Sequence, residues 1–164
     1  MVSLEEALEV SDRKSLRTLM MNVIRGDYRK SLASITLALN SEDSETSHYA
    51  ASILQDVLND FRSGVQEKYL LCQEENEQQT ENCIRLAEYM NPILEQKVLT
   101  DLEQHSMTEK MKDVLETAWQ LDKGKISSTV YEEICLRLLE TKDYAACEVW
   151  CDRAMEQYPR VLSS

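Results

Sequence analysis

The chain has 164 residues and a formal net charge of −12. So acidic a chain is repelled by nucleic acid and by anionic lipid, and neither is expected as a partner. Only 3 Gly and 2 Pro are present, and the apolar residues recur at helical spacing along nearly the whole length. This pattern predicts an all-α protein without sheet.

The five cysteines are an odd number, and no secretory signal opens the sequence. Both observations favour a reducing compartment. No apolar run approaches the ~20 residues that a membrane helix needs, so direct membrane insertion by this segment is not expected.

Three short helices are predicted at the start of the chain. Ser3 and Glu6 fit a capping box that begins the first helix, over residues 3–10. The second and third helices are expected over residues 11–24 and 28–39, separated by a turn that contains a glycine.

An acidic loop over residues 40–45 leads into a long helix. Ser44 or Ser47 can begin this helix, and its apolar stripe continues to about residue 73. Gly64 lies inside it and costs about 1 kcal/mol relative to alanine, so a kink is conceivable there. The polar residues that follow are either a loop or the solvated start of the next helix.

The next helix carries Cys83 and Met90 on its apolar side, and the Asn91-Pro92 pair is expected to interrupt it. The chain is predicted to be helical again over residues 94–121, as one helix or two, until Gly124 ends it.

Residues 128–161 form the most informative segment, because they predict a helix, a turn and a second helix. The first helix has apolar residues at i, i+3, i+4 and i+7, and the second repeats this spacing. The turn is placed at residues 142–144, and Pro159 is expected to end the second helix. The residues on which the pattern depends are Tyr131, Ile134, Cys135, Leu138, Tyr144, Cys147, Trp150, Cys151 and Ala154.

In length and in its order of large and small residues, this segment resembles a tetratricopeptide repeat. Small residues at Cys135, Cys147 and Ala154 match the positions where two helices approach closely, whereas Lys142 stands where the pattern often has glycine. The resemblance implies a right-handed α-solenoid of antiparallel helical hairpins, with about seven or eight helices in one domain over residues 1–164. An ordinary helical hairpin is the alternative.

No constellation of catalytic residues is evident. His48 and His105 are the only histidines, and neither is spaced from a cysteine as metal ligands are. Cys147 and Cys151 share a helix face and, with Cys135, are expected to be buried packing residues. No phosphate-binding loop or nucleophile motif occurs. We therefore expect no enzymatic activity, no cofactor and no metal.

A second resemblance concerns the order of elements along the chain. It is carried by residues 4–12, 19–22 and 40–51, by the Glu45-Thr-Ser-His-Tyr49 helix start, and by the closing residues 150–153 and 158–159. In these segments the chain is similar to the cytoplasmic repeat region of PelE-type proteins of bacterial Pel exopolysaccharide (biofilm) biosynthesis. This resemblance implies a scaffold for a membrane-associated synthase, with cyclic-di-GMP receptor or glycosyltransferase components as partners. It implies a cytoplasmic chain, or the soluble part of a protein anchored in the inner membrane.

Two functions follow. One is the polysaccharide-synthase scaffold, and the other is a free cytoplasmic adaptor that binds a helical or basic peptide segment. The repeat register predicts five partner-binding residues on the inner face of its first helix: Thr129, Glu132, Leu136, Leu139 and Glu140. None of the five is basic, so the face disfavours a terminal carboxylate and suits a helix or a basic segment.

Overall fold

The computed structural model describes residues 28–162, without the side chains of residues 28–31 and 161–162, and every regular element among them is helical. The all-α prediction is therefore confirmed for this part of the chain. The helices predicted over residues 3–10 and 11–24 lie outside it. Six helices of at least twelve residues are described, slightly fewer than the seven or eight expected for the whole chain.

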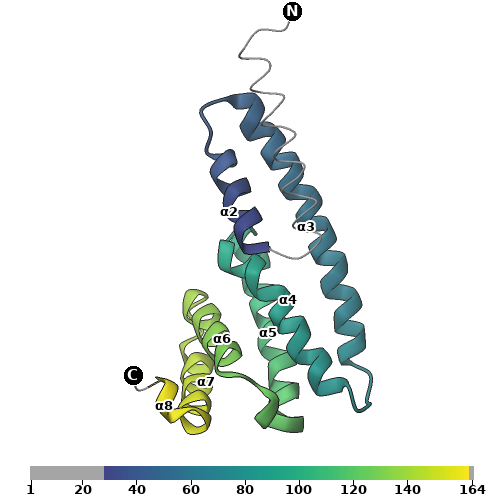
Figure 1. The fold of residues 1–164 in the computed structure, drawn as a ribbon, viewed down its shortest axis with the longest axis vertical. Coiled ribbons are helices and arrows are strands. Elements are labelled where there is room, and N and C mark those ends of the chain that lie inside the picture. Colours follow the sequence, from purple (N-terminus) through teal and green to yellow (C-terminus); the bar gives the residue numbers. More distant parts are fainter. Residues whose placement is uncertain (1–27, 163–164) are drawn as a thin grey trace, which may run out of the picture. The chain divides into compact units, whose positions relative to one another are not determined.

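The chain divides into two compact units, Met1–Gly64 and Val65–Ser164. In the first unit the structure describes α2 (Tyr28–Leu39) and the part of α3 (Ser44–Cys72) that ends at Gly64. Both bury the apolar stripes that the sequence predicted, as at Leu32 and Phe61. The α3 helix continues without a break through Gly64, and its ribbon is unbroken in Figure 1.

The second unit contains two helical hairpins. The first is α4 (Gln79–Gln96) with α5 (Asp101–Asp122), and the second is α6 (Ser128–Glu140) with α7 (Tyr144–Gln157). A short 3-10 turn, η1 (Lys123–Lys125), joins the hairpins, and a single turn, α8 (Pro159–Leu162), follows α7. Figure 1 shows each hairpin as two neighbouring helices joined by a short connection. Tyr131 and Trp150 pack together between α6 and α7, with ring centroids 5.9 Å apart.

The predicted break at Asn91-Pro92 is wrong. The α4 helix includes Pro92 and ends at Gln96, where Lys97 adopts a left-handed conformation with φ 54°. Asn91 is buried and accepts a hydrogen bond from Arg137 on α6, so the segment around the proline is packed against other helices of the unit. The chain resumes as α5 after Thr100, whose hydroxyl accepts a hydrogen bond from the Glu103 amide.

Helix α5 runs uninterrupted over Asp101–Asp122, so this stretch is one helix and not two. Its end is near the expected place, because η1 contains Gly124. The turn between α6 and α7 covers residues 141–143, one residue before the predicted 142–144, and α7 ends at Gln157, before Pro159 as predicted.

The turn between α6 and α7 has a geometry that favours glycine at the position of Lys142. Lys142 has φ 61°, and its amide donates to the Leu139 carbonyl at 3.1 Å, while the Asp143 amide donates to the Leu138 carbonyl at 3.0 Å. This pair of bonds is a Schellman motif, in which the left-handed residue is usually glycine because a Cβ atom is strained there. The lysine closes the helix with the right hydrogen bonds but in a strained backbone conformation.

Two polar contacts fasten α7 to α5. Arg153 forms an ion pair with Glu116 and lies over the Trp119 ring, 3.8 Å from its centroid. At the other end of α7, Lys112 forms an ion pair with Asp143 at 3.2 Å, and Asp143 also accepts the Ala146 amide as the helix cap.

We expect Lys142→Gly to stabilise the protein by roughly 0.5–1 kcal/mol, because glycine adopts a positive φ without a Cβ penalty. Lys142→Ala is the matched control: it removes the same side chain and keeps the strained Cβ, so it should give no such gain. Urea unfolding followed by circular dichroism measures both. Equal stability of the two variants would contradict the proposed strain.

Acidification should weaken the attachment of α7 to α5. The hydrogen bond from Arg153 lowers the pKa of Glu116, and the Ala146 amide, with Lys112, lowers the pKa of Asp143. A carboxyl group whose pKa is lower in the folded state contributes stability above its unfolded pKa of about 4 and loses it as the pH falls through the folded value.

The free energy of unfolding should therefore fall below about pH 5, and it should fall less steeply in Glu116→Gln. Glu148→Gln, which removes an exposed carboxylate from α7 rather than a paired one from α5, is the control with the same change in charge. Urea unfolding between neutral pH and about pH 3 gives the comparison. A Glu116→Gln profile parallel to that of the wild type would count against this account.

Candidate functional site

A hollow of about 270 Å³ opens between α6 and α7 on the surface of the second unit. We call it the α6–α7 groove. Buried Tyr131 and Ala154 and half-buried Cys135 and Cys151 line it together with exposed residues. The exposed lining residues are Glu132, Leu136 and Met155.

Two large apolar side chains are exposed to solvent at this groove. Leu136 on α6 is 45% exposed and Met155 on α7 is 59% exposed. Such residues gain free energy when a partner covers them, at roughly 25 cal/mol for each Å² of apolar surface buried. Methionine adapts its shape to different partners, which suits a binding surface.

The surroundings of the groove are acidic. Glu132 lies on the groove itself, and Glu148 and Asp152 are exposed on the α7 face that carries Met155, at helical spacings of seven and three residues. No ion pair holds these three carboxylates among residues 28–162. An apolar surface bordered by carboxylates attracts a partner that carries positive charge around apolar residues.

All five residues predicted to bind a partner lie on α6 and are exposed. The structure brings two of them, Glu132 and Leu136, into the groove. Leu139 is 52% exposed but does not line the groove, nor do Thr129 and Glu140. Whether these residues bind a partner stays a prediction.

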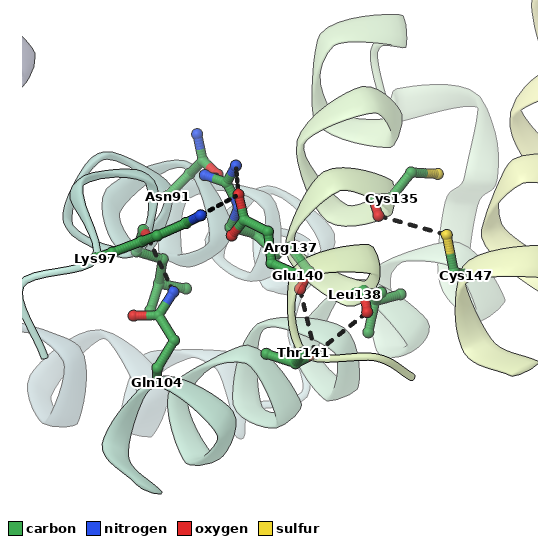
Figure 2. A network of polar contacts seen from close by, with 10 residues as sticks. Asn91, Lys97, Gln104, Cys135, Arg137, Leu138, Glu140, Thr141 and Cys147 are labelled. Carbon is green, nitrogen blue, oxygen red and sulfur yellow. Dashed lines mark hydrogen bonds and ion pairs between the residues drawn. The ribbon is translucent and has the colours of Figure 1, made fainter. Parts of the chain in front are cut away.

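Glu140 has a structural contact that the repeat register did not suggest. Its carboxylate accepts a hydrogen bond from Arg137 Nη2 at 2.9 Å and lies 3.9 Å from Lys97 Nζ, as Figure 2 shows. Arg137 is only 4% exposed, and its Nη1 donates to Asn91 Oδ1 on α4 at 3.3 Å. Glu140 therefore compensates a buried charge between the two hairpins.

The groove is also lined by residues that the sequence analysis predicted to be packing residues only. Cys135 and Cys151 were expected to be buried, and the structure has both half-buried, together with Cys147. Ala154 is buried between the helices, as expected for a small residue in the pattern. Met155 was missed, although it stands four residues after Cys151 and so shares its helix face.

Burial raises the pKa of Cys135 and of Cys147, so both thiols are mainly protonated at neutral pH. Among residues 28–162, no group of three or more His, Cys, Asp or Glu residues is arranged to hold a metal ion. Within the same residues, no helix combines the length and apolar character needed to cross a membrane.

The chain was compared with protein-family models, with curated proteins and with solved structures, and it matches none of them. The resemblances to tetratricopeptide repeats and to PelE-type proteins therefore stay predictions.

We expect the contributions of Asn91 and Arg137 to the free energy of unfolding to be coupled, because their side chains form a hydrogen bond. Arg137→Met leaves the buried Asn91 side-chain oxygen without its donor, and Asn91→Leu leaves Nη1 of the guanidinium without its acceptor, although Nη2 keeps Glu140. Each change should cost about 1–3 kcal/mol. The double variant should cost less than the sum of the two, with a coupling of about 0.5–3 kcal/mol.

Urea unfolding of the four proteins in this double-mutant cycle measures the coupling. Glu81→Gln with Lys125→Met, which removes an exposed ion pair of the same unit, is the control cycle, and its coupling should be below about 1 kcal/mol. Additive losses at Asn91 and Arg137 would show that the contact does not join the two hairpins.

Proposed function

We propose that this chain is a non-catalytic protein-interaction module, and that its α6–α7 groove binds an amphipathic helix of a partner. The partner helix carries apolar side chains that cover Leu136 and Met155, and Lys or Arg residues on either side of them. The exposure of these two apolar residues at one acidic groove is the observation that carries the proposal.

The size of the groove favours side chains over a small-molecule ligand. Its volume of about 270 Å³ lies below the range of about 300–1,000 Å³ that is typical of small-molecule sites. An amphipathic helix places apolar residues at i, i+3, i+4 and i+7, and this spacing matches a groove that runs between two helices.

The acidic residues around the groove favour a partner with positive charge. Exposed carboxylates at Glu132, Glu148 and Asp152 increase the rate of encounter with a basic helix and disfavour an acidic one. Added salt should weaken this attraction, because charges on exposed surfaces are screened over about 8–10 Å at ordinary ionic strength.

In this proposal the helical hairpins belong to a right-handed solenoid, and the groove lies in its last repeat. The Pel-type synthase is the complex that the sequence resemblance names, with its cyclic-di-GMP receptor or glycosyltransferase as the partner. A free cytoplasmic adaptor for a basic helix is the alternative. Co-purification of the full chain with tagged synthase components distinguishes them: retention of a component supports the synthase, and its absence favours the adaptor.

The groove itself can be tested without knowing the partner. We expect a designed amphipathic peptide with leucines at helical spacing and flanking lysines to bind the protein, as measured by fluorescence anisotropy. The same peptide with glutamates in place of the lysines should bind at least ~10-fold more weakly.

Leu136→Glu with Met155→Glu should weaken binding of the lysine peptide by ~10-fold or more, because both apolar contacts are lost. Leu102→Glu is the matched control, since Leu102 is 82% exposed on α5 and does not line the groove. Circular dichroism shows whether each variant is folded. Unchanged binding by the folded double variant would place the interface elsewhere.

A further inference from the structure

Three cysteine sulfurs meet where α6 packs against α7. Cys151 Sγ lies 3.4 Å from Cys135 Sγ across the two helices and 4.0 Å from Cys147 Sγ on its own helix. Cys147 Sγ lies 3.5 Å from the Cys135 carbonyl oxygen, a contact drawn in Figure 2. The three thiols therefore form one cluster rather than three separate packing residues.

This cluster is accessible to small solutes, unlike the other two cysteines. Cys135 and Cys151 both line the α6–α7 groove and are half-buried. Cys72 and Cys83, in contrast, are 1% and 0% exposed. A small oxidant that enters the groove reaches sulfur at its floor.

We propose that Cys135 and Cys151 are an oxidation site, at which a peroxide joins them in a disulfide that links α6 to α7. One sulfur, as a thiolate, attacks a peroxide oxygen and becomes a sulfenic acid, and the O–O bond breaks to release water after proton uptake. The second sulfur attacks the sulfenic sulfur, the S–OH bond breaks, and a second water leaves. Two thiols and one hydrogen peroxide thus give one disulfide and two waters.

The geometry favours the Cys135–Cys151 pair over the Cys147–Cys151 pair. A disulfide has an S–S distance of about 2.05 Å and a Cβ–Cβ distance of about 3.5–4.5 Å. Residues four apart on a helix have Cβ atoms about 5–6 Å apart, so Cys147 and Cys151 are held too far apart by their own helix. Cys135 and Cys151 stand on different helices, and their sulfurs are 3.4 Å apart, closer than the 4.0 Å between Cys147 and Cys151.

The reaction should be slow, since burial raises the pKa of Cys135 and keeps its thiolate scarce at neutral pH. The cross-link joins positions 16 residues apart and restricts the unfolded chain, so the oxidised protein should unfold at a higher temperature. It also fixes the distance between the two helices at the floor of the groove.

The test is treatment of the folded full chain with hydrogen peroxide, followed by alkylation of the remaining thiols, proteolysis and mass spectrometry. The expected product is a peptide pair joined through Cys135 and Cys151, with a mass lower by two hydrogens, which dithiothreitol separates. The melting temperature of the oxidised protein should rise and return to its original value on reduction.

Cys147→Ser is the matched control and should still form the cross-link, whereas Cys135→Ser and Cys151→Ser should lose it and the rise in melting temperature. A background of Cys72→Ala with Cys83→Ala removes any contribution from that pair. Peptide mapping of the wild type provides a result that does not depend on any variant folding. Alkylation of both Cys135 and Cys151 after prolonged peroxide treatment, or a cross-link through Cys147 in its place, would overturn the proposal.

Discussion

The guanidinium of Arg137 is the interaction on which the arrangement of the two C-terminal hairpins depends. It is buried between α6 and α4, and it is compensated by Glu140 on one side and by Asn91 on the other. A buried charge is costly unless it is paired and hydrogen-bonded. Glu140 lies on the same helix as Arg137, so the bond to Asn91 is the one that a shift of α6 along α4 would break, while Nε of Arg137 has no hydrogen-bond partner within residues 28–162.

Charged side chains also fasten α7, near the end of the chain, to α5. Arg153 reaches Glu116 and the Trp119 ring, and Lys112 reaches the cap of α7 at Asp143. These charges are used within the fold and are not available to a partner. The carboxylates around the groove, such as Glu132 and Glu148, have no such ion pairs among the described residues, and the exposed surface there is accordingly acidic.

Local signals in the sequence were sufficient for most helices and for the turn between α6 and α7. The apolar stripe of α3 and the helix–turn–helix pattern of residues 128–161 place these elements correctly, because period and turn chemistry are properties of neighbouring residues. The break predicted at Asn91-Pro92 was wrong, since α4 continues to Gln96 and its buried Asn91 contacts Arg137, 46 positions away. No local pattern contains that contact.

The groove was predicted only in part, for a related reason. The repeat register identified Glu132 and Leu136 on the exposed face of α6, and both line the groove. It assigned Glu140 to binding because it considered one helix at a time, whereas Arg137 makes Glu140 part of the contact with α4. Met155 belongs to the opposite helix, so its place in the groove follows only from the packing of α6 on α7.

The bond between Asn91 and Arg137 has a consequence for how relatives of this chain can be recognised. Substituting either residue alone leaves a buried polar group without its partner, so replacement of one side chain favours replacement of the other in the same lineage. An Asn-Pro pair inside a helix, followed 46 residues later by an arginine and three residues further by a glutamate, is thus a composite signature. Paired changes at these positions across divergent sequences would trace the fold where overall similarity has been lost.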